Sequence, residues 1–364
     1  MPLSPTFEAV ASAFVLLCAF VLALFVGSFS LPGKHWLGFP QPDGLRKRYK
    51  LTGMSLFVAT HIVVANGIMR FGWSPTTLIR HFWDLLIAAN IFAAVWTLVL
   101  YSTGRARSGS IAHQGRFSMV RDLWYGMELN PEWMGVDLKV FAYQPSLIGL
   151  GVLNFAFAWT QFELYGTLSP QMILYQAFWW SYLVTHYWFE RGVLSMWDVI
   201  AERFGFMLVW GDLVLVPFFY CIGGWYLLHE LAPMSVPVLT AILLLFATGL
   251  WVFREANAQK DRFKRDASSK IWGKPAEALG GKLLVSGWWG FARKINYTGE
   301  ISVYLSFALA TGTHSLVPYL LPLWLCVLLP HRAWRDEQRC RAKYGPLWTS
   351  YCERARFRMI PFIY

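Results

Sequence analysis

The chain has 364 residues, of which 56% are hydrophobic and 15% are charged, whereas soluble proteins average about 25% charged residues. This composition excludes an ordinary soluble enzyme, and the aromatic content of 18% excludes a disordered chain. A net charge of +11 would suggest nucleic acid in a soluble protein, but membrane proteins gather basic residues in cytoplasmic loops. We therefore predict an integral membrane protein with no nucleic-acid partner.

Apolar segments long enough to cross a bilayer follow one another along most of the chain. A span needs about 20 apolar residues, and on this criterion we predict spans near 9–30, 54–72, 81–101, 146–164, 171–189, 205–228, 234–253, 284–311 and 313–330. The first segment lacks a cleavage-site pattern, so we interpret it as a span and not as a signal peptide. The expected fold is an all-α, polytopic helix bundle with about nine or ten transmembrane helices.

Basic residues are distributed unevenly between the two sides of these spans. With the N-terminus outside, only Arg70 and Arg80 flank a loop on the side opposite to the other Lys and Arg residues. The positive-inside rule then places the basic side and the C-terminus in the cytosol. We expect a multi-pass protein of a bacterial inner membrane or of the endoplasmic reticulum membrane.

Cysteine and histidine spacing gives no sign of a metal site. The five cysteines form no CxxC pair, and no HExxH occurs. These patterns argue against a disulfide framework and against a zinc site. We therefore expect no bound metal.

Ionisable residues inside the predicted spans are candidates for function, because they are costly in hydrocarbon. Asp212 lies near the middle of its span, and Tyr220, eight residues later, is expected on about the same helix face. A packing hydrogen bond to a neighbouring helix is the alternative role for Asp212. His186 and Glu190 form an i, i+4 pair with Tyr182 two turns before Glu190, and a structural role is the simpler interpretation of His186.

The segment SGWWGFARKINYTGE (286–300) is an unusual span because it is polar. Arg293, Asn296, Tyr297 and Glu300 recur at spacings of three, four and seven, which predicts a polar stripe on one helix face. Lipid cannot face such a stripe. We expect it to line a polar cavity that opens to the cytoplasmic side.

Two basic elements flank this span, at 256–266 and 331–345. Both fit an ordinary juxtamembrane patch that contacts anionic lipid. The second mixes charged and aromatic residues, which suit phosphate binding and ring stacking: Arg332, Arg335, Asp336, Tyr344, Trp348 and Tyr351. A polyanionic aromatic cofactor fits this mixture, and the lack of GxGxxG excludes a Rossmann-type site.

The motifs over nearly the whole chain resemble one known family. They are LPGK, PDGLRKRYKLTG, YGMELNP, VDLKVFAYQPSLIG, MWDVIAERFGFMLVWGDLVLVPF, NAQKDRFKRD, GWWGFARKINYTGE and HRAWRDEQRCRAKYGPLWTSYC with the terminal RMIPFIY. The sequence is similar to the sterol reductases, a family that includes sterol C14 reductases, 7-dehydrocholesterol reductase, sterol C24(28) reductase and the membrane half of lamin B receptor. The last two motifs are specific to this group.

The resemblance implies NADPH-dependent reduction of a sterol carbon–carbon double bond in sterol biosynthesis. LPGK and PDG…YKLTG favour the C14 double bond, and reduction at C24, C24(28) or C7 is the alternative. We expect one membrane domain over 1–364, with N-terminal helices and substrate-side loops in 1–203 and the NADPH and sterol pockets in 204–364. The sterol and membrane lipids are the expected partners, without an obligate protein partner.

Matched motif by motif, the resemblance implies a set of NADPH-binding residues: Lys260, Lys264, Leu284, Trp289, Asn296, Tyr297, Arg332, Asp336, Tyr344 and Tyr351. We call these the cofactor set. The i, i+4 spacing of Lys260 and Lys264 suits a 2′-phosphate or a pyrophosphate. The chain departs from the family's usual residues at a few positions, which are Lys264, Lys294 and Glu300 in place of Arg, His and Asp, and Glu132 and Gln144 in place of Arg.

Reduction of an isolated alkene requires a proton donor as well as a hydride, so a buried acid is needed. The candidate donors are Tyr182, Glu190, Asp198 and Asp212. Aromatic residues at 179, 180, 187 and 188 could stabilise a developing cation or anchor the protein at the lipid interface.

Two other functions remain as alternatives. An isoprenylcysteine-type methyltransferase has a comparable Arg…Asn-Tyr…Glu helix, but Ile295 stands where its proline is expected. A sterol-binding scaffold without catalysis is the second alternative.

Overall fold

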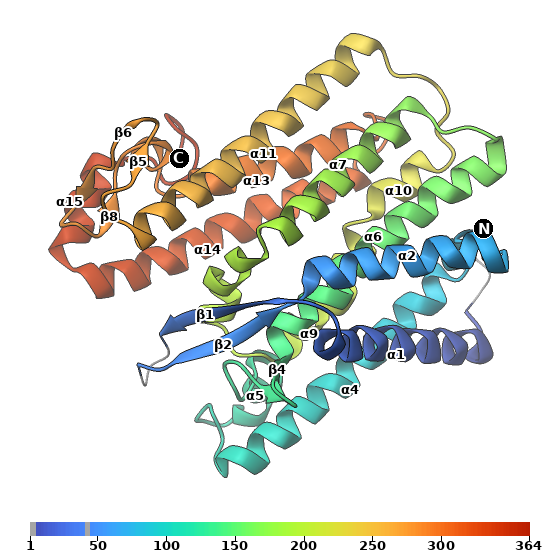
Figure 1. The fold of residues 1–364 in the computed structure, drawn as a ribbon, viewed down its shortest axis with the longest axis horizontal. Helices are drawn as coiled ribbons and strands as arrows, with labels where there is room; N and C mark the ends of the chain where they lie inside the picture. The colour runs from blue at the N-terminus through green and yellow to red at the C-terminus, as the bar shows by residue number, and fades with distance from the viewer. Residues whose placement is uncertain (1–4, 41–43) are drawn as a thin grey trace. The chain divides into compact units, whose positions relative to one another are not determined.

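The computed structural model describes residues 5–40 and 44–364, so Pro42 and Asp43 of the PDG motif lie outside the described residues. The fold is mostly helical (Figure 1). It divides into two compact units. Unit 1 comprises Met1–Leu168 and Trp179–Glu230, and unit 2 comprises Ser169–Phe178 and Leu231–Tyr364.

The elements of unit 1 are mainly long apolar helices joined by short hairpins and turns. They are α1 (Phe7–Ser30), β1 (Lys34–Pro40), β2 (Arg46–Leu51), α2 (Gly53–Phe71), α3 (Thr76–Arg80), α4 (Phe82–Ser108), α5 (Ser118–Tyr125), β3 (Glu132–Trp133), β4 (Val136–Asp137), α6 (Leu138–Tyr165), the 3-10 helix η1 (Glu190–Ser195), α8 (Trp197–Ile200), α9 (Phe206–Trp210), the π-helix η2 (Gly211–Phe219) and α10 (Ile222–Leu227). Helix α7 (Pro170–Trp188) begins in unit 2 and ends in unit 1.

Helix α6 is the central helix of unit 1, and most of its residues are buried. It begins where the Asp137 carboxylate accepts hydrogen bonds from the backbone N–H groups of Lys139 and Val140, which caps the helix N-terminus. The Lys139 ammonium is buried and donates to the carbonyls of Asp198, at 2.7 Å, and Glu202, at 2.6 Å. These bonds satisfy a buried charge and hold the 198–202 turn against α6.

Unit 2 consists of long helices with small hairpins between them. Its elements are α11 (Val236–Arg265), β5 (Lys270–Ile271), β6 (Lys274–Pro275), β7 (Ala278–Leu279), β8 (Leu283–Leu284), α12 (Trp288–Phe291), α13 (Ile295–Leu309), the 3-10 helix η3 (Val317–Tyr319), α14 (Leu320–Tyr344) and α15 (Pro346–Arg354). Helix α13 packs against both α11 and α14, and the three long helices lie side by side in Figure 1. The cofactor set is distributed over these elements.

The membrane-protein prediction is confirmed. Among the described residues, six helical segments are long and apolar enough to cross a membrane: α1, α2, α4, α6, the stretch 206–227 and α11. The predicted spans near 171–189, 284–311 and 313–330 contain α7, α13 and the first part of α14. Helix α13 has only 15 residues, and the second part of α14 is strongly charged, so both miss this criterion.

Glycines allow α11 and α13 to cross at close range. A Cβ built on Gly299 would lie 2.6 Å from the Phe253 backbone nitrogen and 2.7 Å from the Gly249 carbonyl oxygen. Close backbone approach through small residues is a common way for membrane helices to pack. Lys260 and Lys264 of the cofactor set lie on α11, and Asn296 and Tyr297 lie on α13. This crossing therefore sets the distance between the two pairs.

We expect the substitution Gly299→Ala to destabilise the protein by about 1–3 kcal/mol, because the added methyl group overlaps backbone atoms that cannot rotate away. Thermal unfolding in detergent, followed by tryptophan fluorescence, measures the effect. Gly192→Ala is the control, since a Cβ at that exposed glycine meets no atom within 4 Å. Equal unfolding temperatures of the two variants would contradict the proposed role of the crossing.

Candidate functional site

All ten residues of the cofactor set lie in unit 2. Lys260 and Lys264 are on the last turns of α11, and Leu284 and Trp289 are on β8 and α12. The other members are on the last three helices: Asn296 and Tyr297 on α13, Arg332, Asp336 and Tyr344 on α14, and Tyr351 on α15. Segments almost a hundred residues apart in sequence therefore belong to one compact unit.

An ion pair between Lys294 and Asp336 lies at the centre of this group. Lys294 is 6% exposed and precedes α13. The charge of Lys294 acts on Lys260 and Lys264, and all three lysines interact with Asp336. Burial alone would raise the pKa of the Asp336 carboxyl, but the neighbouring Lys294 ammonium holds this pKa below its ordinary value. This region concentrates positive charge around one carboxylate.

The lysines on α11 adjoin an aromatic wall. The Lys260 ammonium nitrogen lies 4.3 Å from the centre of the Trp289 ring, a distance at which a cation–π interaction is favourable. The Trp289 indole N–H donates to the Ala256 carbonyl at 2.8 Å, and its ring packs with Phe263 and Leu284 in a buried cluster. Leu284 and Trp289 therefore form a rigid apolar surface beside Lys260.

Asn296 presents an acceptor that the described residues do not satisfy. Its amide nitrogen donates to the Asn257 side chain at 3.3 Å, while its Oδ1 atom is buried without a hydrogen-bond partner among residues 5–40 and 44–364. A buried amide oxygen normally has a partner. Asn296 is therefore suited to accept a hydrogen bond from a bound molecule.

The aromatic residues of the tail are packed together. The rings of Tyr344 and Trp348 are stacked at 6.5 Å, and those of Trp348 and Tyr351 are 5.1 Å apart. Trp348 and Tyr351 are buried against Val285, and burial raises the pKa of the Tyr351 hydroxyl to about 12. Tyr344 is the half-buried member of this group.

The prediction that Arg293 shares a helix face with Asn296, Tyr297 and Glu300 is wrong. Helix α13 begins only at Ile295, because Ala292 is extended and pairs with Phe357. The Arg293 guanidinium is buried and binds Glu337 at 2.9 Å and the carbonyl of Ala355 at 2.6 Å.

Arg293 instead joins the tail to the start of α13. The Glu337 carboxylate accepts from Arg293 through Oε1 and from Arg358 through Oε2. The backbone N–H of Lys294 also donates to the Arg358 carbonyl at 2.7 Å. Sequence reasoning missed Glu337 and Arg358, although the alternation of charges in HRAWRDEQR was a possible signal.

The four candidate proton donors all lie in unit 1. Glu190 is 8% exposed, and both of its carboxylate oxygens accept from the Gly53 backbone N–H, at 3.0 and 3.1 Å. The Gln144 amide donates to the same carboxylate at 3.0 Å. Burial raises the pKa of Glu190 to about 7 despite these hydrogen bonds. Gly53 is required here, because a Cβ would lie 2.4 Å from a Glu190 oxygen.

The other three candidates have different surroundings. Tyr182 is buried with its ring edge-on to Trp179, and Asp198 is buried with the Tyr143 hydroxyl 3.4 Å from its carboxylate. Asp212 is half-buried in the π-helix η2. Because a π-helix has a wider turn than an α-helix, the face predicted for Asp212 and Tyr220 from α-helical spacing does not apply.

The aromatic residues near these candidates divide into two groups. Trp179 and Tyr187 are 1% and 2% exposed, and Trp180 is half-buried. Trp188 is 75% exposed. Lipid-interface anchoring therefore suits Trp188 and not the two buried rings.

One departure from the expected family pattern is explained locally. Glu132 and Asp137 both bind the Lys47 ammonium, at 2.9 and 2.8 Å. Lys47 and Glu132 line a polar hollow of about 400 Å³. An arginine at position 132 would place a second cation beside Lys47, so the glutamate fits this chain.

The sequence of the chain is similar to those of known proteins. Residues 3–364 match the model of the ergosterol biosynthesis ERG4/ERG24 family. The chain is 40% identical to a delta(14)-sterol reductase of Arabidopsis thaliana, covering 100% of this chain and 99% of the relative. It is 37% identical to a delta(14)-sterol reductase of Methylotuvimicrobium alcaliphilum, covering 94% and 82%. It is also 33% identical to a 7-dehydrocholesterol reductase of Xenopus laevis, covering 90% and 73%.

Proposed function

Because the chain belongs to the ergosterol biosynthesis ERG4/ERG24 family of sterol reductases, we propose that it reduces the C14 double bond of a sterol with NADPH. Its 40% identity over full length to a delta(14)-sterol reductase supports C14, and reduction at C7, C24 or C24(28) is the alternative. The family match favours a reductase over an isoprenylcysteine-type methyltransferase and over a scaffold without catalysis.

The observation that carries the cofactor proposal is the concentration of ammonium groups around Asp336. Lys260, Lys264 and Lys294 lie within electrostatic reach of one another. The single carboxylate of Asp336 offsets only one of these three positive charges, and a dinucleotide phosphate would offset the others. When bound, NADPH supplies the hydride. The residues present therefore fit the cofactor.

Each part of the cofactor set suits one part of a dinucleotide. Lys260 and Lys264 would hold a 2′-phosphate or pyrophosphate, and Arg332 a further phosphate oxygen. Asp336 would accept from a ribose hydroxyl or an amide. Asn296 would accept through its unsatisfied Oδ1, and the rings of Trp289, Tyr344 and Tyr351 offer apolar faces.

We propose Glu190 as the proton donor among the four candidates. A donor must be protonated at the working pH and must lose its proton readily. With a pKa of about 7, Glu190 is partly protonated near neutrality, whereas an ordinary carboxyl is fully ionised there. Tyr182, Asp198 and Asp212 remain the competing donors.

The proposed setting is a bacterial inner membrane or the endoplasmic reticulum membrane, with the C-terminus in the cytosol. The distribution of Lys and Arg residues supports this orientation. It places the charged ends of α11 and α14 on the side where NADPH is available. Membrane lipids and the sterol are the proposed partners.

The test of the function is turnover by the purified protein in detergent. The assay contains NADPH and a mixture of C14-, C7-, C24- and C24(28)-unsaturated sterols, and products are identified by mass and retention. We expect one product, reduced at C14. A product reduced elsewhere would move the assignment within the family, and binding of S-adenosylmethionine without sterol turnover would contradict a reductase.

We expect the substitution Lys260→Met to weaken NADPH binding by about tenfold to hundredfold, because a charge-assisted contact to a phosphate is lost. Titration with NADPH, and separately with NADH, measures the change in dissociation constant. Lys282→Met is the control, since that exposed lysine lies outside the cofactor set. A loss confined to NADPH would assign Lys260 to the 2′-phosphate, and unchanged binding of both would contradict its role.

A further inference from the structure

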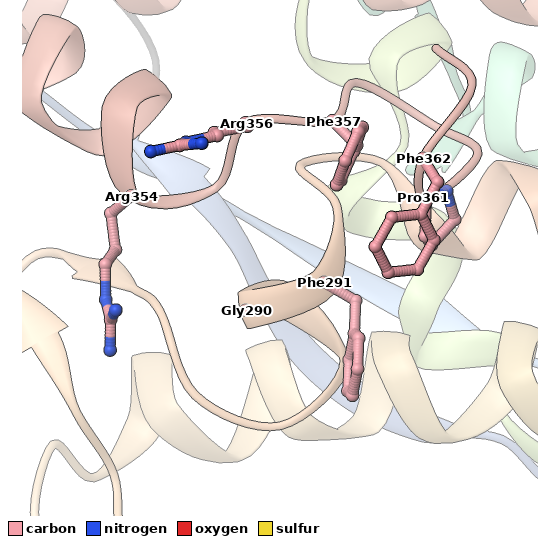
Figure 2. Close-up of a pocket in the computed structure, with 7 residues that line it drawn as sticks. All are labelled: Gly290, Phe291, Arg354, Arg356, Phe357, Pro361 and Phe362. Carbon is pink, nitrogen blue, oxygen red and sulfur yellow. The ribbon is translucent and has the colours of Figure 1, made fainter.

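A small hollow in unit 2 combines aromatic and basic side chains. It has a volume of about 150 Å³ and is lined by Gly290, Phe291, Arg354, Arg356, Phe357, Pro361 and Phe362. Figure 2 shows the three phenylalanine rings on one side and the two arginine side chains on the other. None of these residues belongs to the cofactor set, so the hollow is a separate feature.

The two arginines have little to neutralise them within the protein. Arg356 is exposed and has no ion pair within residues 5–40 and 44–364. The Arg354 guanidinium lies 4.0 Å from the Glu277 carboxylate, and both side chains are mostly exposed. This ion pair therefore contributes little to stability. Arg358, by contrast, is bound to Glu337.

The backbone that carries these arginines is nevertheless held in place. The Arg293 guanidinium donates to the carbonyls of Ala355 and Arg356, at 2.6 and 2.9 Å. Arg293 is buried. The guanidinium groups of Arg354 and Arg356 therefore extend from an anchored segment, which favours a defined binding site over a mobile basic tail.

A chain of aromatic contacts connects the hollow to the level of the membrane surface. Trp251 is 56% exposed and lies near the end of the apolar part of α11, one turn before Arg254. Its ring lies 5.2 Å from Trp288, which lies 5.9 Å from Phe291 at the hollow. Exposed tryptophans at the end of a span mark the interface between hydrocarbon and water.

Apolar side chains in and beside the hollow are exposed. Phe291, Phe362 and Ile363 are 49%, 86% and 81% exposed. Exposed apolar residues beside basic residues are typical of surfaces that enter the headgroup region of a bilayer. The rim of the hollow has this composition.

We propose that the hollow binds the phosphate group of an anionic phospholipid in the leaflet on its own side of the membrane. Arg354 and Arg356 contact the phosphate, because guanidinium groups bind phosphate oxygens with two parallel hydrogen bonds. Phe291 and Phe362 contact the first carbons of the acyl chains. A soluble phosphate would use the arginines alone and would leave the phenylalanines exposed.

The test compares lipid retention by the wild-type protein and by the double variant Arg354→Gln/Arg356→Gln. Both are equilibrated in neutral detergent with phosphatidylcholine and phosphatidylglycerol, and bound lipid is counted by native mass spectrometry. We expect the variant to bind phosphatidylglycerol about tenfold more weakly or worse, with phosphatidylcholine unaffected. Arg46→Gln/Arg48→Gln is the matched control, because it removes two exposed arginines at the same spacing.

Two further measurements separate the outcomes. NADPH binding and the unfolding temperature should be unchanged in the double variant, which shows that it is folded. Inorganic phosphate and glycerophosphoglycerol, which has the headgroup without acyl chains, should compete poorly with the lipid. Equal retention of phosphatidylglycerol by wild type and variant would overturn the proposal, and so would equal binding of the lipid and either soluble phosphate.

Discussion

The substitution Glu337→Gln is expected to lower the free energy of unfolding by about 3–5 kcal/mol, because it removes the charge that two guanidinium groups share. Arg293 and Arg358 each bind a different oxygen of this carboxylate, and the side chains of Glu337 and Arg293 are 6% and 9% exposed. Arg358 is more exposed, so the lower end of that range is expected. Thermal unfolding in detergent measures the loss.

The control for this prediction is Glu353→Gln on α15, which removes the same charge from an exposed residue. Limited proteolysis gives a second readout, because loss of the Arg293 contacts should expose the 355–358 segment to cleavage. Equal unfolding temperatures and equal cleavage rates for both variants would contradict the structural role of Glu337.

The substitution Glu190→Gln is expected to reduce sterol turnover by about 10²–10⁴-fold while NADPH binding is retained, because the variant cannot donate a proton. The parallel variants Tyr182→Phe, Asp198→Asn and Asp212→Asn test the competing donors in the same assay. Glu190→Asp keeps an acid and should recover part of the activity. Normal turnover by Glu190→Gln would exclude Glu190 as the proton donor. The role would then belong to the residue whose variant loses turnover.

The pH dependence follows from the raised pKa of Glu190. Turnover by the wild-type protein should fall as the pH rises through about 7, because the donor then becomes ionised. The free energy of unfolding should also fall as the pH rises. The native pKa exceeds the ordinary value of 4.5, so the folded state binds more protons than the unfolded state, and stability decreases as the pH rises from 4.5 to about 7. Both effects should disappear in Glu190→Gln.

The spans of this fold could be predicted because bilayer thickness imposes a length and a composition that are visible in any single segment. The cofactor set came from the motifs that the chain shares with the sterol reductases, and its role in binding NADPH stays a prediction. Placement of Lys260 and Lys264 on one helix required only the i, i+4 spacing. Local pattern therefore sufficed to place the long apolar helices, whereas the choice of cofactor residues depended on the family resemblance.

The sequence-based predictions were wrong or incomplete where segments that are far apart in the sequence contact one another. The extended backbone at Ala292 depends on pairing with Phe357, and no periodicity in 286–300 indicates that the helix begins only at Ile295. Glu190 and Gly53 are 137 residues apart in the chain, so their hydrogen bonds have no local signal. The π-helix η2 contains Pro217, but a proline alone does not distinguish a wide turn from a kink.

The pairing of 292–294 with 357–358 also has a consequence for biosynthesis. Lys294 takes its position from a backbone bond to Arg358 and from the Asp336 carboxylate, and both partners are translated after it. A nascent chain that ends after α13 therefore still lacks the groups that order this lysine. The region around Lys294 can therefore take its final arrangement only after residue 358 has left the ribosome.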